Sequence, residues 1–326
     1  MTLRRRQFLR LAGAAAAWPF APYVARAQAW PARMIRVIAP FSAGSTVDVV
    51  ARLLLEPLQR QLGQTLVLEN RVGAGGMTGA NVVARADPDG YTFLVNSSAH
   101  SAIPAIYPNV PYDTVRDFAA VASLGSSPNV TVVSPAKGIK TLKELVAAAK
   151  STPGGLTYGT AGVGSATHLS TERFRLSAGF QAIHVPFKGM PEALTEVMTG
   201  RVDFSCSSIA PAVPLIREGK LLALAVTTPK RSSTLPDVPT SLEEGYVDSD
   251  YTFWTGLFAP AKTPREIVER MNREVQKALD AASLQQRLAQ YGVDPMPIAP
   301  AAFDALVKTE VDANIALVKA AGIKVQ

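Results

Sequence analysis

Runs rich in Gly, Ala, Ser and Thr are the part of this chain with the clearest chemical potential. They occupy residues 42–46, 73–79 and 161–165, and the pairs Ser97-Ser98 and Ser207-Ser208 continue the pattern. Small side chains leave backbone N–H groups uncovered, and a helix N-terminus adds a partial positive charge of about half an elementary unit. A single loop of this kind is usually only a tight turn. Several such loops in one chain predict a binding site for an anion.

Three ionisable residues stand beside these loops. Asp48 and His168 each fall in the first turn of a predicted helix, directly after a small-residue loop. Asp48 either complements the helix dipole or holds the loop in shape by hydrogen bonds, and His168 is expected to bond its loop. Lys188 is either a cation for the anionic ligand or a solvated lysine. Phe41 and Trp254 are read either as core residues or as apolar walls of the site.

Signatures of enzymes and of metal sites are weak in this sequence. The chain has no Gly-x-Ser-x-Gly elbow and no Walker motif, and Thr78 replaces the third glycine of a dinucleotide fingerprint. A single cysteine, Cys206, and three histidines are too few for a His/Cys zinc cluster. We therefore expect no metal and no cofactor. The alternative is a secreted hydrolase, with a triad drawn from one of two groups, Ser98, His100 and Asp113 or Ser165, His168 and Glu172.

The first 27 residues have the three parts of an export signal. Arg4, Arg5 and Arg6 precede a short apolar stretch over residues 11–20, and a small-x-small cleavage site ends at Ala27. The Arg5-Arg6 pair fits a twin-arginine leader, although Sec export is also compatible. Cleavage removes five arginines, so the formal charge falls from +7 to 7 − 5 = +2. We expect a periplasmic protein that neither spans a membrane nor binds nucleic acid.

The elements that position the loops follow an α/β pattern with mainly parallel sheets. Strands are predicted over residues 34–39, 65–69 and 91–95, each followed by one of the loops or by a helix. The same order recurs over residues 156–160, 182–185 and 202–205. Two halves with one plan predict two similar lobes related by structural pseudo-symmetry.

The second lobe is predicted to be inserted into the first, with two hinge crossings. Residues 28–125 form the first part of lobe one, 126–251 form lobe two, and 252–326 complete lobe one. Pro264 at a helix start predicts one long helix that runs toward Tyr291. A final helix over about residues 300–321 is expected to close lobe one.

Several motifs resemble one family in this order along the mature chain. They are Pro40-Phe41-x-Ala43-Gly44-x-x-x-Asp48, Gly73-Ala74-Gly75-Gly76, Tyr158-Gly159-x-Ala161-Gly162-x-Gly164-Ser165-x-x-His168, Val185-Pro186-Phe187-Lys188-Gly189, Leu235-Pro236-Asp237-Val238-Pro239-Thr240 and Trp254-x-Gly256-Leu257-x-Ala259-Pro260. They look like the motifs of the Bug-type substrate-binding receptors of tripartite tricarboxylate transporters.

The resemblance implies a two-lobed periplasmic-binding-protein fold of the Venus flytrap type II, with two hinge crossings. It implies a non-enzymatic, monomeric receptor that closes on a small carboxylate, holds it through backbone amides and ordered water, and delivers it to integral membrane transporter subunits. Carried over by position, the ligand-binding residues are Ala43, Gly44, Ser45, Thr46, Gly75, Gly76, Ser97, Ala161, Gly162, Gly164, Ser165 and Asp203. Phe41 and Lys188, which the residue types above make candidates for the site, complete the set of fourteen.

The chain departs from the resemblance at four positions. The family commonly has Pro at Ser42, Gly at Ser45, a small polar residue at Val47 and Asn at Ile103. These changes alter the main anion loop and leave the identity of the carboxylate open. The net charge of +2 favours a mono- or dicarboxylate over a tricarboxylate.

Overall fold

The first lobe is an α/β layer built on a mainly parallel sheet. The computed structural model describes residues 30–323. In this lobe β1 pairs in parallel with β2 and β3, and β3 pairs in antiparallel register with β9. The strands are β1 (Ile35–Ala39), β2 (Leu66–Asn70), β3 (Thr92–Ser97), β9 (Thr252–Pro260) and the first part of β4 (Phe118–Val133).

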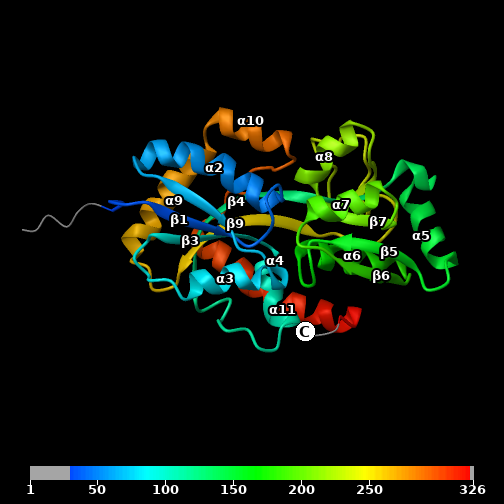
Figure 1. Ribbon diagram of the computed structural model, residues 1–326, viewed down its shortest axis with the longest axis horizontal. Helices are drawn as coiled ribbons and strands as arrows, with labels where there is room; N and C mark the ends of the chain where they lie inside the picture. The colour runs from blue at the N-terminus through cyan, green and yellow to red at the C-terminus, as the bar shows by residue number, and fades with distance from the viewer. Residues whose placement is uncertain (1–29, 324–326) are drawn as a thin grey trace, which may run out of the picture.

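Helices cover both faces of this sheet. Figure 1 shows α2 and α10 on one side and α3, α4 and α11 on the other. The apolar faces of the helices and the strands form a single core cluster that includes Ile38, Leu54 and Phe93. The helices are α2 (Thr46–Leu62), α3 (Met77–Ala84), α4 (Ala99–Ile106), α9 (Arg265–Leu279), α10 (Ala282–Gln290) and α11 (Pro300–Ala321), with a short 3₁₀ turn, η1 (Ala74–Gly76).

The second lobe repeats this plan on a smaller scale. β5 pairs in parallel with β6 and β7, and the end of β4 pairs in antiparallel register with β7 and β8. The strands are β5 (Leu156–Thr160), β6 (Ala182–Pro186), β7 (Phe204–Ser208) and β8 (Leu222–Val226). The helices are α5 (Leu142–Ser151), α6 (Ala166–Ala178), α7 (Met190–Met198) and α8 (Ile209–Arg217), with a 3₁₀ turn, η2 (Pro135–Lys137).

The chain passes between the lobes at two neighbouring places. β4 pairs with β9 from Phe118 to Pro128, and from Asn129 onward it pairs with β7 and β8. The return crossing is adjacent, because Tyr251 N donates to Thr227 O and Thr227 N donates to Asn129 O. The strand order β2-β1-β3-β9-β4-β7-β5-β6 therefore runs through both lobes, with β4 shared between them.

The long helix expected after Pro264 is two helices, α9 and α10, and that expectation is wrong. Its buried residues explain the break. Ala278 ends the buried stripe of α9 and Leu284 begins that of α10. Six residues of an unbroken helix would place Leu284 about 240° around the axis from Ala278. The break lets both helices turn their apolar residues to the core.

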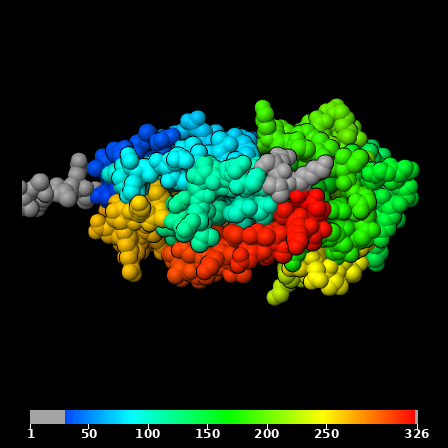
Figure 2. All heavy atoms as spheres, turned by 90° about the horizontal axis from the view of Figure 1, so that it is seen from below, coloured from blue at the N-terminus to red at the C-terminus, as the bar shows by residue number. Residues whose placement is uncertain are grey.

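The last helix, α11, reaches both lobes, although the sequence suggested that it closes only the first. It packs mainly on α4 and β4, and its end packs on α6 of the second lobe. Arg175 Nη2 on α6 donates to the carbonyl of Ala321 at 3.1 Å. Figure 2 shows α11, in orange to red, running from the first lobe to the second.

The packing of α11 on β9 generates a test of the fold. The ring of Phe303 on α11 lies over Gly256 and between Trp254 and Phe258, with ring-centre distances of 5.0 and 5.3 Å. A Cβ at position 256 would lie closer to this ring than van der Waals contact allows.

We predict that Gly256→Ala lowers the free energy of unfolding by about 1 to 3 kcal/mol, the usual cost of overpacking. Urea denaturation of Gly256→Ala, Phe303→Leu and the double variant checks this. The two losses should be less than additive, because the smaller side chain makes room for the methyl group. Strictly additive losses would show that the two residues do not share this contact.

Candidate functional site

Two loops, one in each lobe, start a helix in nearly the same way. Ser45 is the N-cap of α2 and Ser165 is the N-cap of α6, and each hydroxyl accepts the N–H three residues ahead at 3.3 Å. The residue before each serine is a glycine with positive φ, +78° at Gly44 and +76° at Gly164. This left-handed backbone favours glycine and explains its presence at both positions.

A side chain from the first helical turn holds each glycine amide. Gly44 N–H donates to Asp48 Oδ2 at 2.9 Å, and Gly164 N–H donates to His168 Nδ1 at 3.2 Å. His168 Nδ1 can accept only as the Nε2–H tautomer, so this bond assigns the position of its proton. These two hydrogen bonds are the contacts that a loop-shaping role for Asp48 and His168 requires.

The first turns of both helices leave backbone donors without an intrahelical acceptor. In each turn the serine hydroxyl caps the third N–H, and this leaves the N–H groups of the first two helical residues. These residues are Thr46 and Val47 in α2, and Ala166 and Thr167 in α6. The sequence interpretation missed three of the four, although their place directly after a capping serine was a usable signal.

All four of these residues line one cavity between the lobes, which we call the deep cavity. The space between its lining atoms, including the part that is open to solvent, is about 280 Å³. The hydroxyl of Thr46 is buried there and has no hydrogen-bond partner among the residues that the structure describes. The lining contains no charged side chain and consists of Phe41, Ser45, Thr46, Val47, Ser97, Ala161, Ser165, Ala166, Thr167, Met190, Ser208 and Phe253.

Phe41 and Ala161 also border a wider cavity, which we call the outer cavity. The space between its lining atoms, including the part that is open to solvent, is about 1170 Å³. The lobes touch at its edge, where Tyr107 Oη donates to Val163 O at 3.1 Å. A Cβ at Gly75 would clash with the same carbonyl, so the contact requires glycine there. The charged lining residues of the outer cavity are Lys188 and Glu192.

The structure brings ten of the fourteen predicted ligand-binding residues to these two cavities. They are Phe41, Ser45, Thr46, Gly75, Gly76, Ser97, Ala161, Gly162, Ser165 and Lys188. Three further predicted residues line neither cavity but lie in the turns before α2 and α6. They are Ala43, Gly44 and Gly164. The residues that the prediction missed include Met190, Ser208 and Phe253, which come from other elements.

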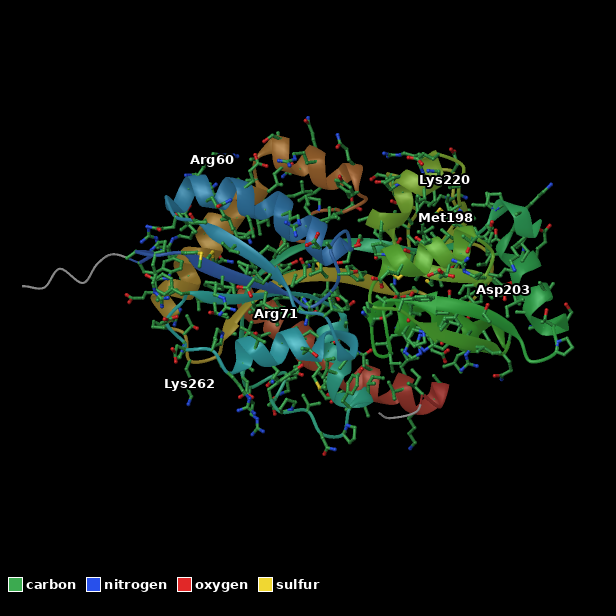
Figure 3. The ribbon with its side chains drawn as sticks, viewed as in Figure 1. Arg60, Arg71, Met198, Asp203, Lys220 and Lys262 are labelled. Atoms are coloured by element: carbon green, nitrogen blue, oxygen red, sulfur yellow. The ribbon has the colours of Figure 1, made fainter. Side chains whose placement is uncertain are left out.

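Asp203 is not brought to either cavity, and its place in the strand gives the reason. Its carboxylate accepts from Lys137 Nζ at 2.6 Å and from Thr157 Oγ1 at 2.8 Å. It precedes β7, whereas Ser208 at the carboxyl end of that strand lines the deep cavity. Five residues of strand separate the two by about 16 Å. Figure 3 shows Asp203 toward the outer end of the second lobe.

Comparison with known proteins decides the family. Residues 50–323 match the Tripartite tricarboxylate transporter family receptor, TctC. That match covers 323 − 50 + 1 = 274 of the 326 residues. The chain belongs to this receptor family. The resemblance of the sequence motifs is thereby confirmed.

Known relatives of this receptor span nearly its whole length. The UPF0065 protein of the tcbD-tcbE intergenic region of a Pseudomonas species is 36% identical over 288 residues, which cover 88% of this chain and 86% of the relative. MatC of Rhodopseudomonas palustris, solved with bound malate, is 35% identical with a TM-score of 0.84, over 89% of this chain and all of MatC. The periplasmic binding protein BugD is 33% identical with a TM-score of 0.87, over 91% of this chain and all of BugD. The two-lobed periplasmic-binding-protein fold is confirmed.

Neither hydrolase triad is assembled in the receptor. His168 Nδ1 accepts from Gly164, and Glu172 accepts from Tyr158 Oη at 2.6 Å and from Arg175. In the other group, Ser98 Oγ bonds Tyr251 Oη and Asp113 bonds Arg116. Within residues 30–323 there is no cluster of three or more His, Cys, Asp or Glu side chains fit for a metal ion. No helix in that range is long and apolar enough to cross a bilayer.

Two stacked histidines support the loop of the second lobe from behind. The rings of His168 and His184 lie 3.9 Å apart, and Tyr158 stacks on His184 at 5.0 Å. His184 Nε2 bonds Thr160 Oγ1 at 2.6 Å, and that oxygen accepts Gly162 N–H at 3.2 Å. The sequence places His184 only within the strand predicted over residues 182–185, since nothing local shows the partner that a strand side chain will meet.

The burial of these rings makes the stability of the receptor depend on pH. Burial, followed by the charge of Arg175, lowers the pKa of His168 to about 4. Burial, followed by the neighbouring His168, lowers the pKa of His184 to about 3. The unfolded chain takes up these protons near pH 6.5, so acid favours unfolding.

We predict that the free energy of unfolding falls as the pH drops from 7 to 5, by about 2 kcal/mol for each such histidine. His184→Gln keeps a group that can bond Thr160 but removes one titrating site. Its loss of stability between pH 7 and 5 should therefore be smaller by about 2 kcal/mol, as measured by urea unfolding at several pH values. Equal losses in the two proteins would show that the pKa of His184 is the same in the folded and the unfolded chain.

Proposed function

We propose that this receptor captures a small carboxylate between its lobes and delivers it to the membrane subunits of a tripartite tricarboxylate-type transporter. The observation that carries the proposal is the pair of helix N-termini at one cavity, with four backbone N–H groups that the helices cannot satisfy. Such groups favour an anion over a neutral ligand. The malate found in MatC, a relative of similar length, supports the carboxylate class.

In this proposal the receptor is exported and does not catalyse a reaction. The leader of residues 1–27, cleaved after about Ala27, lies outside the residues that the structure describes. The mature periplasmic protein is a monomer with lobe one in residues 28–125 and 252–326 and lobe two in residues 126–251. The membrane subunits are the partner because the family is that of transporter receptors.

The proposed ligand contacts combine predicted residues with those that the structure adds. The amides of Thr46, Val47, Ala166 and Thr167 bind the carboxylate, and Phe41, Ser97 and Ala161 surround the ligand. Gly75, Gly76, Gly162 and Lys188 form the outer edge of the site. Asp48 and His168 hold the two loops in the binding geometry.

The decisive experiment compares acids with their uncharged amides. We predict that mono- and dicarboxylates raise the melting temperature of the purified receptor, whereas the matched amides do not. A ligand at 100 times its dissociation constant adds about 2.7 kcal/mol to the free energy of unfolding. If the amides stabilise the receptor as well as the acids do, recognition of an anion by the helix N-termini is wrong.

Thr46 allows a second test, because its buried hydroxyl has no partner among the described residues. Thr46→Val removes that hydroxyl at nearly constant volume. We predict that it raises the free energy of unfolding by about 1 kcal/mol and weakens the binding of an acid about tenfold. Urea unfolding and calorimetric titration measure the two effects.

Thr114 provides the matched control for this substitution. Its hydroxyl is also buried without a partner in the described part of the chain, but it lines neither cavity. Thr114→Val should stabilise the receptor without changing its affinity for the acid. An unchanged affinity in Thr46→Val as well would remove Thr46 from the binding site.

A further inference from the structure

The apolar side chains that line the deep cavity narrow the class of carboxylate that fits. We infer that the deep cavity selects acids with an unsubstituted hydrocarbon body over acids that carry a hydroxyl, an ammonium or a second carboxylate at the far end. This inference rests on the proposed function and adds the chemistry of the rest of the ligand. It follows from which polar groups of the lining are already engaged and which side chains remain.

Most hydroxyls of the lining are already engaged within the protein. Ser45 Oγ accepts from Asp48 N, and Ser97 Oγ accepts from Ala99 N at 3.4 Å. Thr167 Oγ1 accepts from Ala161 N at 3.1 Å and bonds Ser165 Oγ at 3.0 Å. Among the described residues, the helix N-termini, Thr46 and Ser208 thus supply the polar groups that remain free, whereas the other hydroxyls already take part in hydrogen bonds within the protein.

Large apolar side chains supply much of the remaining wall. Phe41 follows β1, Met190 begins α7 and Phe253 belongs to β9, so three separate elements bring apolar surface to one place. Each of these side chains is at most 5% exposed. Val47 adds a fourth apolar side chain from the first turn of α2.

No side chain of the deep cavity can balance a second charge. The charged lining residues of the site, Lys188 and Glu192, belong to the outer cavity, beyond Phe41 and Ala161, and both are exposed. They also have opposite signs. A polar group at the far end of a short ligand is therefore removed from water without a partner, and this is costly.

A series of five-carbon probes tests the inference by calorimetric titration. The probes are pentanoate, 5-hydroxypentanoate, 5-aminopentanoate, glutarate and pentanamide, which share one chain length. Three of them differ from pentanoate only at the far end, and pentanamide differs only at the carboxyl end. We expect pentanoate to bind most tightly and 5-hydroxypentanoate about tenfold more weakly. Glutarate and 5-aminopentanoate should bind at least 100-fold more weakly than pentanoate, because each buries an unpaired charge.

The outcomes separate this inference from the proposed function. If glutarate, 5-hydroxypentanoate or 5-aminopentanoate binds as tightly as pentanoate, the inference is overturned and the carboxylate receptor stands. If pentanamide binds as well as pentanoate, or if no acid binds, the proposed function itself is overturned. Tight binding of pentanoate alone supports both.

A pair of methionines on α7 provides the matched variants. Met190 lines the deep cavity, whereas Met198 ends the same helix and lines neither cavity. Figure 3 labels Met198 in the second lobe. Met190→Gln adds an amide of similar size to the apolar wall, and it should bring the affinities for pentanoate and 5-hydroxypentanoate within about threefold of each other. Met198→Gln should keep their tenfold ratio, and Val47→Thr offers the same test from α2. An unchanged ratio in both cavity variants overturns the inference.

Discussion

The first two N–H groups of an α-helix have no acceptor inside the helix, and this constraint governs the site of the receptor. Two helices begin at one cavity, and the residues that carry four such groups line it. The loops before them must keep these groups uncovered and still hold their own backbone in place. A glycine with positive φ, a capping serine and an acceptor in the first helical turn meet these needs twice.

The two loops are alike in backbone geometry but differ in charge. Burial opposes the ionisation of Asp48, but hydrogen bonds from Arg52, Gly44 and Asn70 outweigh it and keep the pKa of Asp48 below its usual value. Its negative charge is offset by Arg52, at 3.0 Å. In the second lobe the same position holds a neutral histidine that burial keeps unprotonated. The first lobe therefore needs a cation close to its loop, and the second lobe does not.

Local patterns in the sequence predicted the parts of the fold and site that depend on neighbouring residues. The small-residue loops, the final helix, and the places of Asp48 and His168 beside their loops depend on residues close in the chain. The break between α9 and α10 depends on where Ala278 and Leu284 meet the core, which no local signal shows. Phe253 and Met190 reach the cavity from distant elements, and the direction of β7 carries Asp203 away from it.

Because α11 packs on both lobes, its contacts stabilise the arrangement in which the lobes touch. Separation of the lobes must either slide α6 along α11 or pull the last turn of α11 with the second lobe, because Arg175 bonds the carbonyl of Ala321. The hydrogen bond from Tyr107 to the carbonyl of Val163 also opposes separation of the lobes. Since neither contact involves a ligand, both would stabilise the joined lobes in the unliganded protein as well. A larger fraction of unliganded molecules with joined lobes raises the apparent affinity of the cleft without any change in the groups that touch the ligand.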